Sequence, residues 1–143
     1  MTADDAIRTV RERGILMQEA VPAGVGGMSA VLGMTADEIN AVVDEIPNVQ
    51  VANYNCPGQI VISGLKEAVE TAAVKLKEAG ARRVIPLNVS GPFHSYLLEE
   101  AGEKLGRFLE NIPVSEPMIP YVANVTAAYV TKAEDVKPLL TRQ

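Results

Sequence analysis

The sequence predicts an α/β protein with a ferredoxin-like βαββαβ unit at residues 25–90. The first observation is the order of its segments, which alternate between strand-like runs and helical stripes as β-α-β-β-α-β. The second is a Cys-Pro-Gly turn at 56–58, which joins the two middle strands as a hairpin. The third is that both helical stretches carry apolar residues three and four positions apart.

An amphipathic helix is predicted at residues 4–21, before this unit. Two aspartates at its start suit the positive end of a helix dipole. Apolar residues follow at spacings of three and four, so we expect the stripe that they form to be buried. The stripe consists of Ile7, Val10, Gly14, Met17 and Val21.

The first half of the unit contains a strand, a helix and a second strand. A glycine-rich stretch leads into a β-like run within 21–34, but its glycines lack the spacing of a phosphate-binding loop. Thr35 and Glu38 form a T-x-x-E capping box, which predicts that a helix begins there. The alternation of "VQVANYN" at 49–55 predicts the second strand.

The second half repeats this pattern with a strand, a helix and a fourth strand. "QIVISG" at 59–64 is the third strand. The next helix buries a stripe that includes Ala72 and Leu76, and it stops at Gly80. "RRVIPLNVSG" at 82–91 predicts the last strand of the unit.

The pattern changes after residue 91. Apolar spacing up to Ile112 predicts a helix of about five turns. An extended segment with two prolines follows at 117–126, and a helix interrupted by Pro138 closes the chain at 133–143. The helices on both sides of the unit have apolar faces without an obvious sheet to cover. Either their partner is missing, or they pack on the open face of the small sheet.

Composition and charge exclude several classes of function. The chain of 143 residues has a net charge of −5 and only 4% aromatic residues, which argues against nucleic-acid surfaces and base-stacking platforms. No apolar run approaches the roughly 18–20 residues of a membrane span. The single Cys56 excludes an internal disulfide. With no export signal at the start, we expect the cytoplasm.

His94 is the only histidine and the first candidate for chemistry. It lies between a strand and a helix, where α/β proteins tend to place working groups, and imidazole is the commonest general base. Two serines flank it, but Ser95 fits a helix N-cap and Ser90 fits the end of a strand. From the residues alone, His94 is either a catalytic base or a lone histidine at an element boundary.

Arg13 borders the apolar stripe of the first predicted helix. An arginine on the buried flank of a helix needs an anion. A substrate carboxylate held by two N–H groups of the guanidinium would serve, and so would a structural aspartate or glutamate. The sequence leaves both explanations open.

Two other groups of polar residues also have a structural and a functional explanation. Arg82 and Arg83 follow two lysines and form the densest basic cluster of the chain. They are either a solvated helix end or a docking patch for an acidic partner. Asn53 and Asn124 lie within apolar strand-like segments, as local caps or as hydrogen-bonding groups of a site.

Four segments of the chain match a known family. They are "RTVRERGILMQEAVPAGVGGMSAVLG", "VANYNCPGQIVISG", "AGARRVIPLNVSGPFHS" and "IPYVANV" with the final "RQ". They resemble malonyl-CoA:acyl carrier protein transacylases of fatty acid synthesis, and they are similar to acyltransferase domains of polyketide synthases. The similarity runs over essentially the whole chain. It implies a ferredoxin-like small subdomain at 23–90, while 1–22 and 91–143 belong to an α/β-hydrolase-like body.

The resemblance also implies a ping-pong reaction. A serine attacks the malonyl thioester of coenzyme A, and a histidine activates that serine and later deprotonates the phosphopantetheine thiol of the acyl carrier protein. His94 in "GPFHS" matches this histidine, and Arg13 in "RERGILMQ" matches the arginine that holds the malonyl carboxylate. Phe93 matches the malonyl-selective form of the motif. No metal or resident cofactor is implied.

The resemblance also implies residues that bind the substrate and the carrier protein. The substrate-binding set is Arg13, Phe93, Met17, Asn53 and Asn124. Arg82 and Arg83 are the residues implied to dock the carrier protein. The partners implied are malonyl-CoA and acyl carrier protein, with no nucleic acid and no membrane.

The sequence departs from the family at the nucleophile. Its 143 residues contain no G-H-S-x-G elbow and no counterpart of the glutamine-containing stretch of the oxyanion hole. We therefore expect an internal fragment that is inactive alone and self-associates through its apolar faces. Two alternatives remain. One is a non-catalytic ferredoxin-like module that binds an acidic carrier protein, and the other is a polyketide synthase acyltransferase domain.

Overall fold

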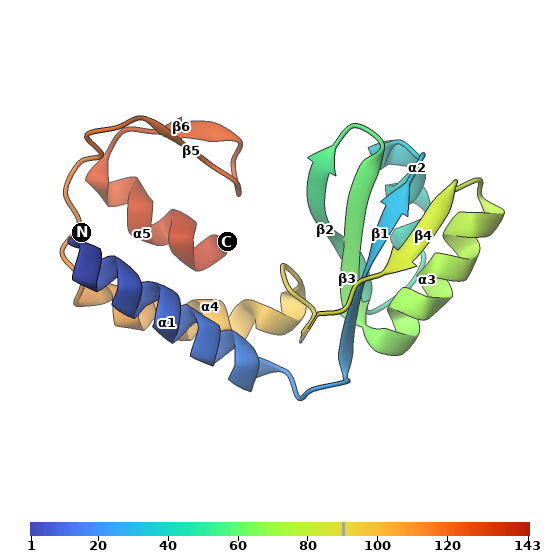
Figure 1. Cartoon of the computed structure of the whole chain (residues 1–143), viewed down its shortest axis with the longest axis horizontal. Coiled ribbons are helices and arrows are strands. Elements are labelled where there is room, and N and C mark those ends of the chain that lie inside the picture. Colours follow the sequence, from blue (N-terminus) through green and yellow to red (C-terminus); the bar gives the residue numbers. More distant parts are fainter. Residues whose placement is uncertain (90) are drawn as a thin grey trace. The chain divides into compact units, whose positions relative to one another are not determined.

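The computed structural model describes residues 1–89 and 91–143, and the contacts divide the chain into two units. Unit 1 consists of Met1–Glu19 and Glu99–Gln143, and unit 2 is Ala20–Leu98. Figure 1 shows the elements of each unit, coloured along the sequence. Residues 91–98 belong to unit 2, whereas the sequence predicted a boundary at 90/91. The assignment of the units to subdomains of a larger enzyme stays a prediction.

Unit 2 is built on a four-stranded antiparallel sheet with the strand order β2-β3-β1-β4 (Figure 1). This is the order of a split βαβ fold, so the predicted ferredoxin-like unit is confirmed. The last strand is shorter than predicted and ends at Pro86, which has no N–H for the ladder. Ser90, expected at its end, lies outside the described residues. The strands are β1 (Gly26–Leu32), β2 (Val49–Cys56), β3 (Gln59–Leu65) and β4 (Arg83–Pro86).

Two helices pack on one face of this sheet, α2 (Ala36–Val43) and α3 (Lys66–Glu78). The predicted capping box begins α2. The Glu38 N–H donates to Thr35 Oγ1 at 3.4 Å, and the Thr35 N–H donates to Glu38 Oε2 at 2.8 Å. The bond from the Thr35 N–H, followed by that from its hydroxyl, lowers the pKa of the Glu38 carboxyl from its ordinary value.

The C-terminus of α3 is closed by a glycine in the left-handed region. Gly80 has a φ of 110°. Its N–H donates to the Lys77 carbonyl at 3.2 Å, and the Ala81 N–H donates to the Leu76 carbonyl at 2.9 Å. These two bonds form a Schellman motif, which explains why the helix ends at the predicted position.

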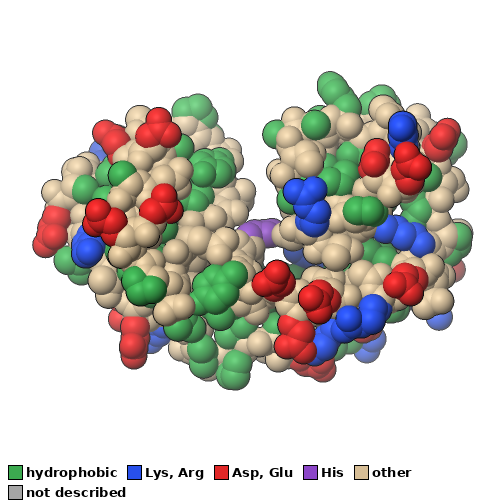
Figure 2. Space-filling view, turned by 180° about the vertical axis from the view of Figure 1, so that it is seen from behind, with side chains coloured by type: hydrophobic (Ala, Val, Ile, Leu, Met, Phe, Trp, Pro, Cys, Tyr) green, Lys and Arg blue, Asp and Glu red, His purple; other side chains and the backbone are tan. Residues whose placement is uncertain are grey.

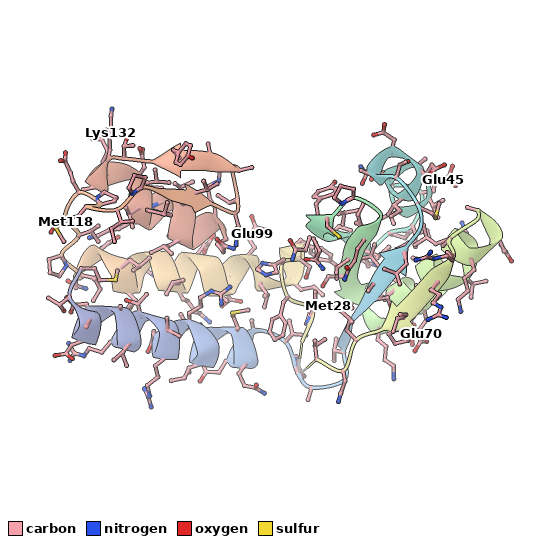
Figure 3. All side chains as sticks on the ribbon, turned by 45° about the horizontal axis from the view of Figure 1, so that its top comes forward. Met28, Glu45, Glu70, Glu99, Met118 and Lys132 are labelled. Carbon is pink, nitrogen blue, oxygen red and sulfur yellow. The ribbon has the colours of Figure 1, made fainter. Side chains whose placement is uncertain are left out.

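The opposite face of the sheet carries a smaller apolar cluster. Successive strand residues point to opposite faces, so Met28 and Ala30 of β1 lie on the side away from Val31 and the helices. Figure 3 labels Met28 on this strand. Val61 completes the buried part of the cluster, and Phe93 packs against it from the loop after β4. This face therefore supports the segment that contains His94.

Unit 1 contains three helices and a two-stranded hairpin among its described residues. Leu105, Leu109 and Ile112 form its buried core, and Leu16 packs against them (Figures 1 and 3 show α1 alongside α4). No helix in the described part of the chain is long and apolar enough to cross a membrane. The elements are α1 (Ala3–Ala20), α4 (Glu99–Glu110), β5 (Tyr121–Ala123), β6 (Ala128–Val130) and α5 (Ala133–Arg142).

Two details of unit 1 differ from prediction. The stripe expected to be buried on the first helix is open at Ile7 and Val10, which are 68% and 71% exposed. The helix instead turns Thr9 and Leu16 inward, because Leu16 lies on the core of α4. Pro138 does not interrupt the last helix, since α5 runs through it, although proline has no N–H to donate within the helix.

Candidate active site

His94 occupies a loop of unit 2 between β4 and a 3-10 turn, η1 (Tyr96–Leu98). Its φ is 56°, in the left-handed region that a residue with a Cβ adopts at a cost of about 1–3 kcal/mol. Such conformations persist only where the surroundings hold them, and they are frequent at functional sites. The side chain is half-buried, and Figure 2 shows the chain's one histidine, in purple, reaching the surface.

The residues before His94 are anchored on the start of β1. Pro92 is fully buried, and a Cβ on Gly26 would overlap its ring, so only a glycine allows this close approach. Phe93 donates its N–H to the Gly91 carbonyl at 3.0 Å and packs in the cluster of Met28. The residues that precede His94 are therefore held in place by packing on the sheet.

The residues after His94 are anchored as well. The buried Ser95 donates its hydroxyl to the Pro92 carbonyl at 2.7 Å. This hydroxyl points back to the loop, and within the described part of the chain no helix N–H is found to donate to it, so the N-cap role predicted for Ser95 gains no support. Tyr96 donates its N–H to Gln50 Oε1 at 3.1 Å and its phenol to Asn48 Oδ1 at 3.0 Å.

Arg13 lies half-buried on α1 of unit 1. Within the described residues its guanidinium makes no ion pair and no hydrogen bond, since the ion pairs found there join Glu100 to Lys104 and Lys132 to Glu134. The structure therefore gives no support to a structural acid as its partner. Met17, four residues later, is half-buried on the same face of the helix.

The predicted basic cluster of Arg82 and Arg83 does not lie beside the His94 loop. Arg82 and Arg83 are both exposed, and Arg83 pairs with Leu32 at the end of β1. Pro92 of the His94 loop lies over Gly26, at the start of the same strand. About 20 Å of strand separates the two positions.

The two asparagines predicted in the site occupy different units. Asn53 is exposed on β2 and donates its side-chain N–H to Asn55 Oδ1 at 2.8 Å. Its neighbour Ala52 shares the apolar cluster with Phe93. Asn124 is exposed in the turn between β5 and β6 of unit 1. No motif in the sequence pointed to Gln50, Asn48 and Tyr96, whose bonds join residues 46 and 48 positions apart.

The chain thus contains a ferredoxin-like unit followed by a hydrogen-bonded histidine loop, and its sequence matches a family of transferases. The model of the acyl transferase domain matches residues 1–137, and the chain belongs to this family. Its relatives identify a narrower group. The chain is 49% identical over 143 residues to the malonyl CoA-acyl carrier protein transacylase of Bacillus subtilis, covering 97% of this chain and 45% of that protein. The corresponding protein of Salmonella typhimurium is 46% identical, with 97% and 46% covered.

Solved structures agree with the sequence comparison. A malonyl CoA-acyl carrier protein transacylase from Clostridium perfringens has a TM-score of 0.95 and 40% identity, covering 100% of this chain and 46% of that chain. A malonyl-transacylase in complex with a type II PKS acyl-carrier protein has a TM-score of 0.93 and 43% identity, covering 96% and 46%. The chain spans about half the length of the curated relatives it matches.

Proposed function

We propose that this chain provides the base and the carboxylate-binding residue of a transacylase. The whole enzyme moves a malonyl group from coenzyme A to the phosphopantetheine thiol of acyl carrier protein. The observation that carries this proposal is the similarity to malonyl CoA-acyl carrier protein transacylases over 97% of the chain. The left-handed, anchored His94 supports it, because such backbone strain is typical of functional sites.

The chemistry proceeds in two half-reactions. His94 accepts the proton of a serine hydroxyl as the oxygen attacks the malonyl thioester, and the imidazolium returns this proton to the departing thiolate of coenzyme A. His94 then accepts the proton of the phosphopantetheine thiol, whose sulfur attacks the malonyl-serine ester. The serine recovers its proton from the imidazolium. No serine of this chain is assigned the role of nucleophile.

Other residues of the chain bind the substrate and take no part in the proton transfers. Arg13 binds the free carboxylate of the malonyl group, and Met17 on the same helix face contacts its carbon chain. Phe93 narrows the space beside His94 and so favours malonyl over branched groups. Asn53 and Asn124 are the polar members of this set. The enzyme works in the cytoplasm and needs no metal or cofactor of its own.

A chimeric enzyme tests the proposed function. In the Bacillus subtilis transacylase, the residues matched to this chain are replaced by its 143 residues. The chimera is expected to transfer labelled malonyl from coenzyme A to acyl carrier protein, and the 143-residue chain alone is not expected to form an acyl-enzyme. A folded chimera that transfers no malonyl would contradict the proposal. The unaltered parent enzyme is the control for the assay.

We also propose that Arg82 and Arg83 dock the acidic carrier protein. Changing both to glutamate in the chimera is expected to raise KM for acyl carrier protein about tenfold, which corresponds to roughly 1.4 kcal/mol. Formation of the malonyl-enzyme from malonyl-CoA should not change. The matched control reverses two exposed arginines of α1, Arg8 and Arg11. Equal effects of both pairs would show a general charge effect and no docking patch.

A further inference from the structure

We infer that Gln50, Asn48 and Tyr96 are positioning residues that hold the imidazole of His94 in place. This inference rests on the proposed function of His94 as a base. The three residues touch no reacting atom in the proposed mechanism. They act through the backbone, because Tyr96 is only two residues from His94 and both of its hydrogen-bonding ends are bound.

The left-handed conformation of His94 makes such a clamp necessary. A non-glycine residue at a φ of 56° relaxes to the right-handed or extended region unless both neighbours are held. On the N-terminal side, the buried Pro92 holds the loop, and its carbonyl accepts the hydroxyl of Ser95, the residue after His94. On the C-terminal side, the hydrogen bonds recorded for Tyr96 are those to Gln50 and Asn48.

The two acceptors are fixed by the sheet. Gln50 pairs with Ser63 of β3, the strand between β2 and β1. The Asn48 carbonyl accepts the Leu65 N–H at 2.9 Å, while its side-chain oxygen accepts the Tyr96 phenol. Tyr96 is thus tied at its backbone and at its ring to one short segment at the start of β2. Gln50 is part of the ladder and Asn48 is hydrogen-bonded to β3, whereas the loop is not part of the ladder.

These bonds control position more than overall stability. Both lie at the surface, where a single hydrogen bond adds little to the stability of a fold. A general base, in contrast, is sensitive to displacement, and a misplacement of about 1 Å can lower a rate by about 100-fold. Loss of either bond should therefore affect proton transfer while leaving the unit folded.

The single histidine allows a direct test by NMR on the 143-residue chain. Its imidazole Cε1–H gives one unambiguous signal. The signal is expected to shift or split in Gln50→Met, which keeps the length of the side chain but removes the acceptor, and in Tyr96→Phe, which removes only the phenol. It should stay in place in Gln50→Glu, which keeps an acceptor oxygen, and in Gln59→Met, at the far end of the same sheet. An unchanged signal in both Gln50→Met and Tyr96→Phe would overturn the inference.

Kinetics of the chimera separate this inference from the proposed function. Gln50→Met is expected to lower kcat for malonyl transfer about tenfold with KM for malonyl-CoA nearly unchanged, and Gln50→Glu should restore most of it. If His94→Asn leaves malonyl transfer intact, the proposed function fails. If His94→Asn abolishes transfer while Gln50→Met and Tyr96→Phe keep the full kcat, the positioning role fails and the function stands. Should Gln50→Met unfold, Tyr96→Phe carries the same comparison.

Discussion

Replacing His94 by asparagine is expected to lower malonyl transfer by the chimera about a thousandfold, within the range of about 10²–10⁴ typical of a general base. The choice of asparagine follows from the backbone. His94 has a φ of 56°, and asparagine tolerates the left-handed region better than alanine does. The variant therefore keeps the loop conformation while losing the group that accepts a proton. Steady-state transfer to acyl carrier protein and single-turnover acylation should both fall.

A second substitution at the same position distinguishes chemistry from folding. Glycine adopts a positive φ without strain and leaves space where the imidazole was. His94→Gly is therefore expected to be as inactive as His94→Asn but to regain part of its rate when free imidazole is added. The thermal midpoints of both variants should stay close to that of the unchanged chimera. An inactive His94→Gly that imidazole does not rescue, together with a lowered midpoint, would argue for a structural histidine.

The local elements of unit 2 were predictable because their signals lie within a few residues. The capping box needs only Thr35 and Glu38, and the end of α3 needs only Gly80 and the carbonyls of one turn. The Pro57-Gly58 turn fixed the hairpin, and the hairpin with its two helices fixed the strand order. The capping box, the helix end and the hairpin turn are set by sequence neighbours, so tertiary packing did not alter them, whereas the pairing of β1 with β3 and β4 joins distant residues.

The buried face of the first helix was not predictable from the same kind of pattern. Helix α1 has apolar residues on two sides, and periodicity cannot tell which side meets a partner. Leu16 lies against the α4 core, so Ile7 and Val10 are left exposed. From the sequence, we expected this helix to have an apolar face without an obvious sheet to cover. We did not expect Ile7 and Val10 to be exposed, because the stripe that contains them was predicted to be buried.

The residues of the candidate site show the same contrast between local sequence signals and long-range contacts. His94 and Phe93 were proposed as site residues because a histidine after a strand is visible in the sequence and the motif around it is specific. Their support was not visible, because the bonds of Tyr96 reach Gln50 and Asn48 across most of unit 2. The serine beside His94 makes a bond that the sequence did not predict. A hydroxyl at a helix start predicts a cap that accepts an N–H, whereas the bond seen here is one in which the hydroxyl donates to the carbonyl three residues earlier.

Replacing Arg13 by alanine is expected to lower kcat/KM for malonyl-CoA about 100-fold in the chimera and to leave transfer of acetyl nearly unchanged. Hydrogen bonds to a charged group contribute about 1.5–3 kcal/mol, and a guanidinium holds a carboxylate through two of them. Acetyl has no carboxylate, so it loses nothing when the guanidinium is removed. The preference for malonyl over acetyl should therefore collapse by about the same factor of 100.

Two further variants show whether the loss of malonyl preference comes from the two-point contact between the guanidinium and the carboxylate. Arg13→Lys keeps the positive charge but cannot bind both carboxylate oxygens in one plane. Its preference for malonyl over acetyl should therefore be only about tenfold higher than that of Arg13→Ala. Arg11→Ala removes an exposed arginine from the same helix and should behave like the unchanged chimera. If Arg13→Ala lowers malonyl and acetyl transfer equally, its guanidinium supports the helix and not the substrate. A selective loss of malonyl transfer is the outcome that we expect from the proposed role of Arg13.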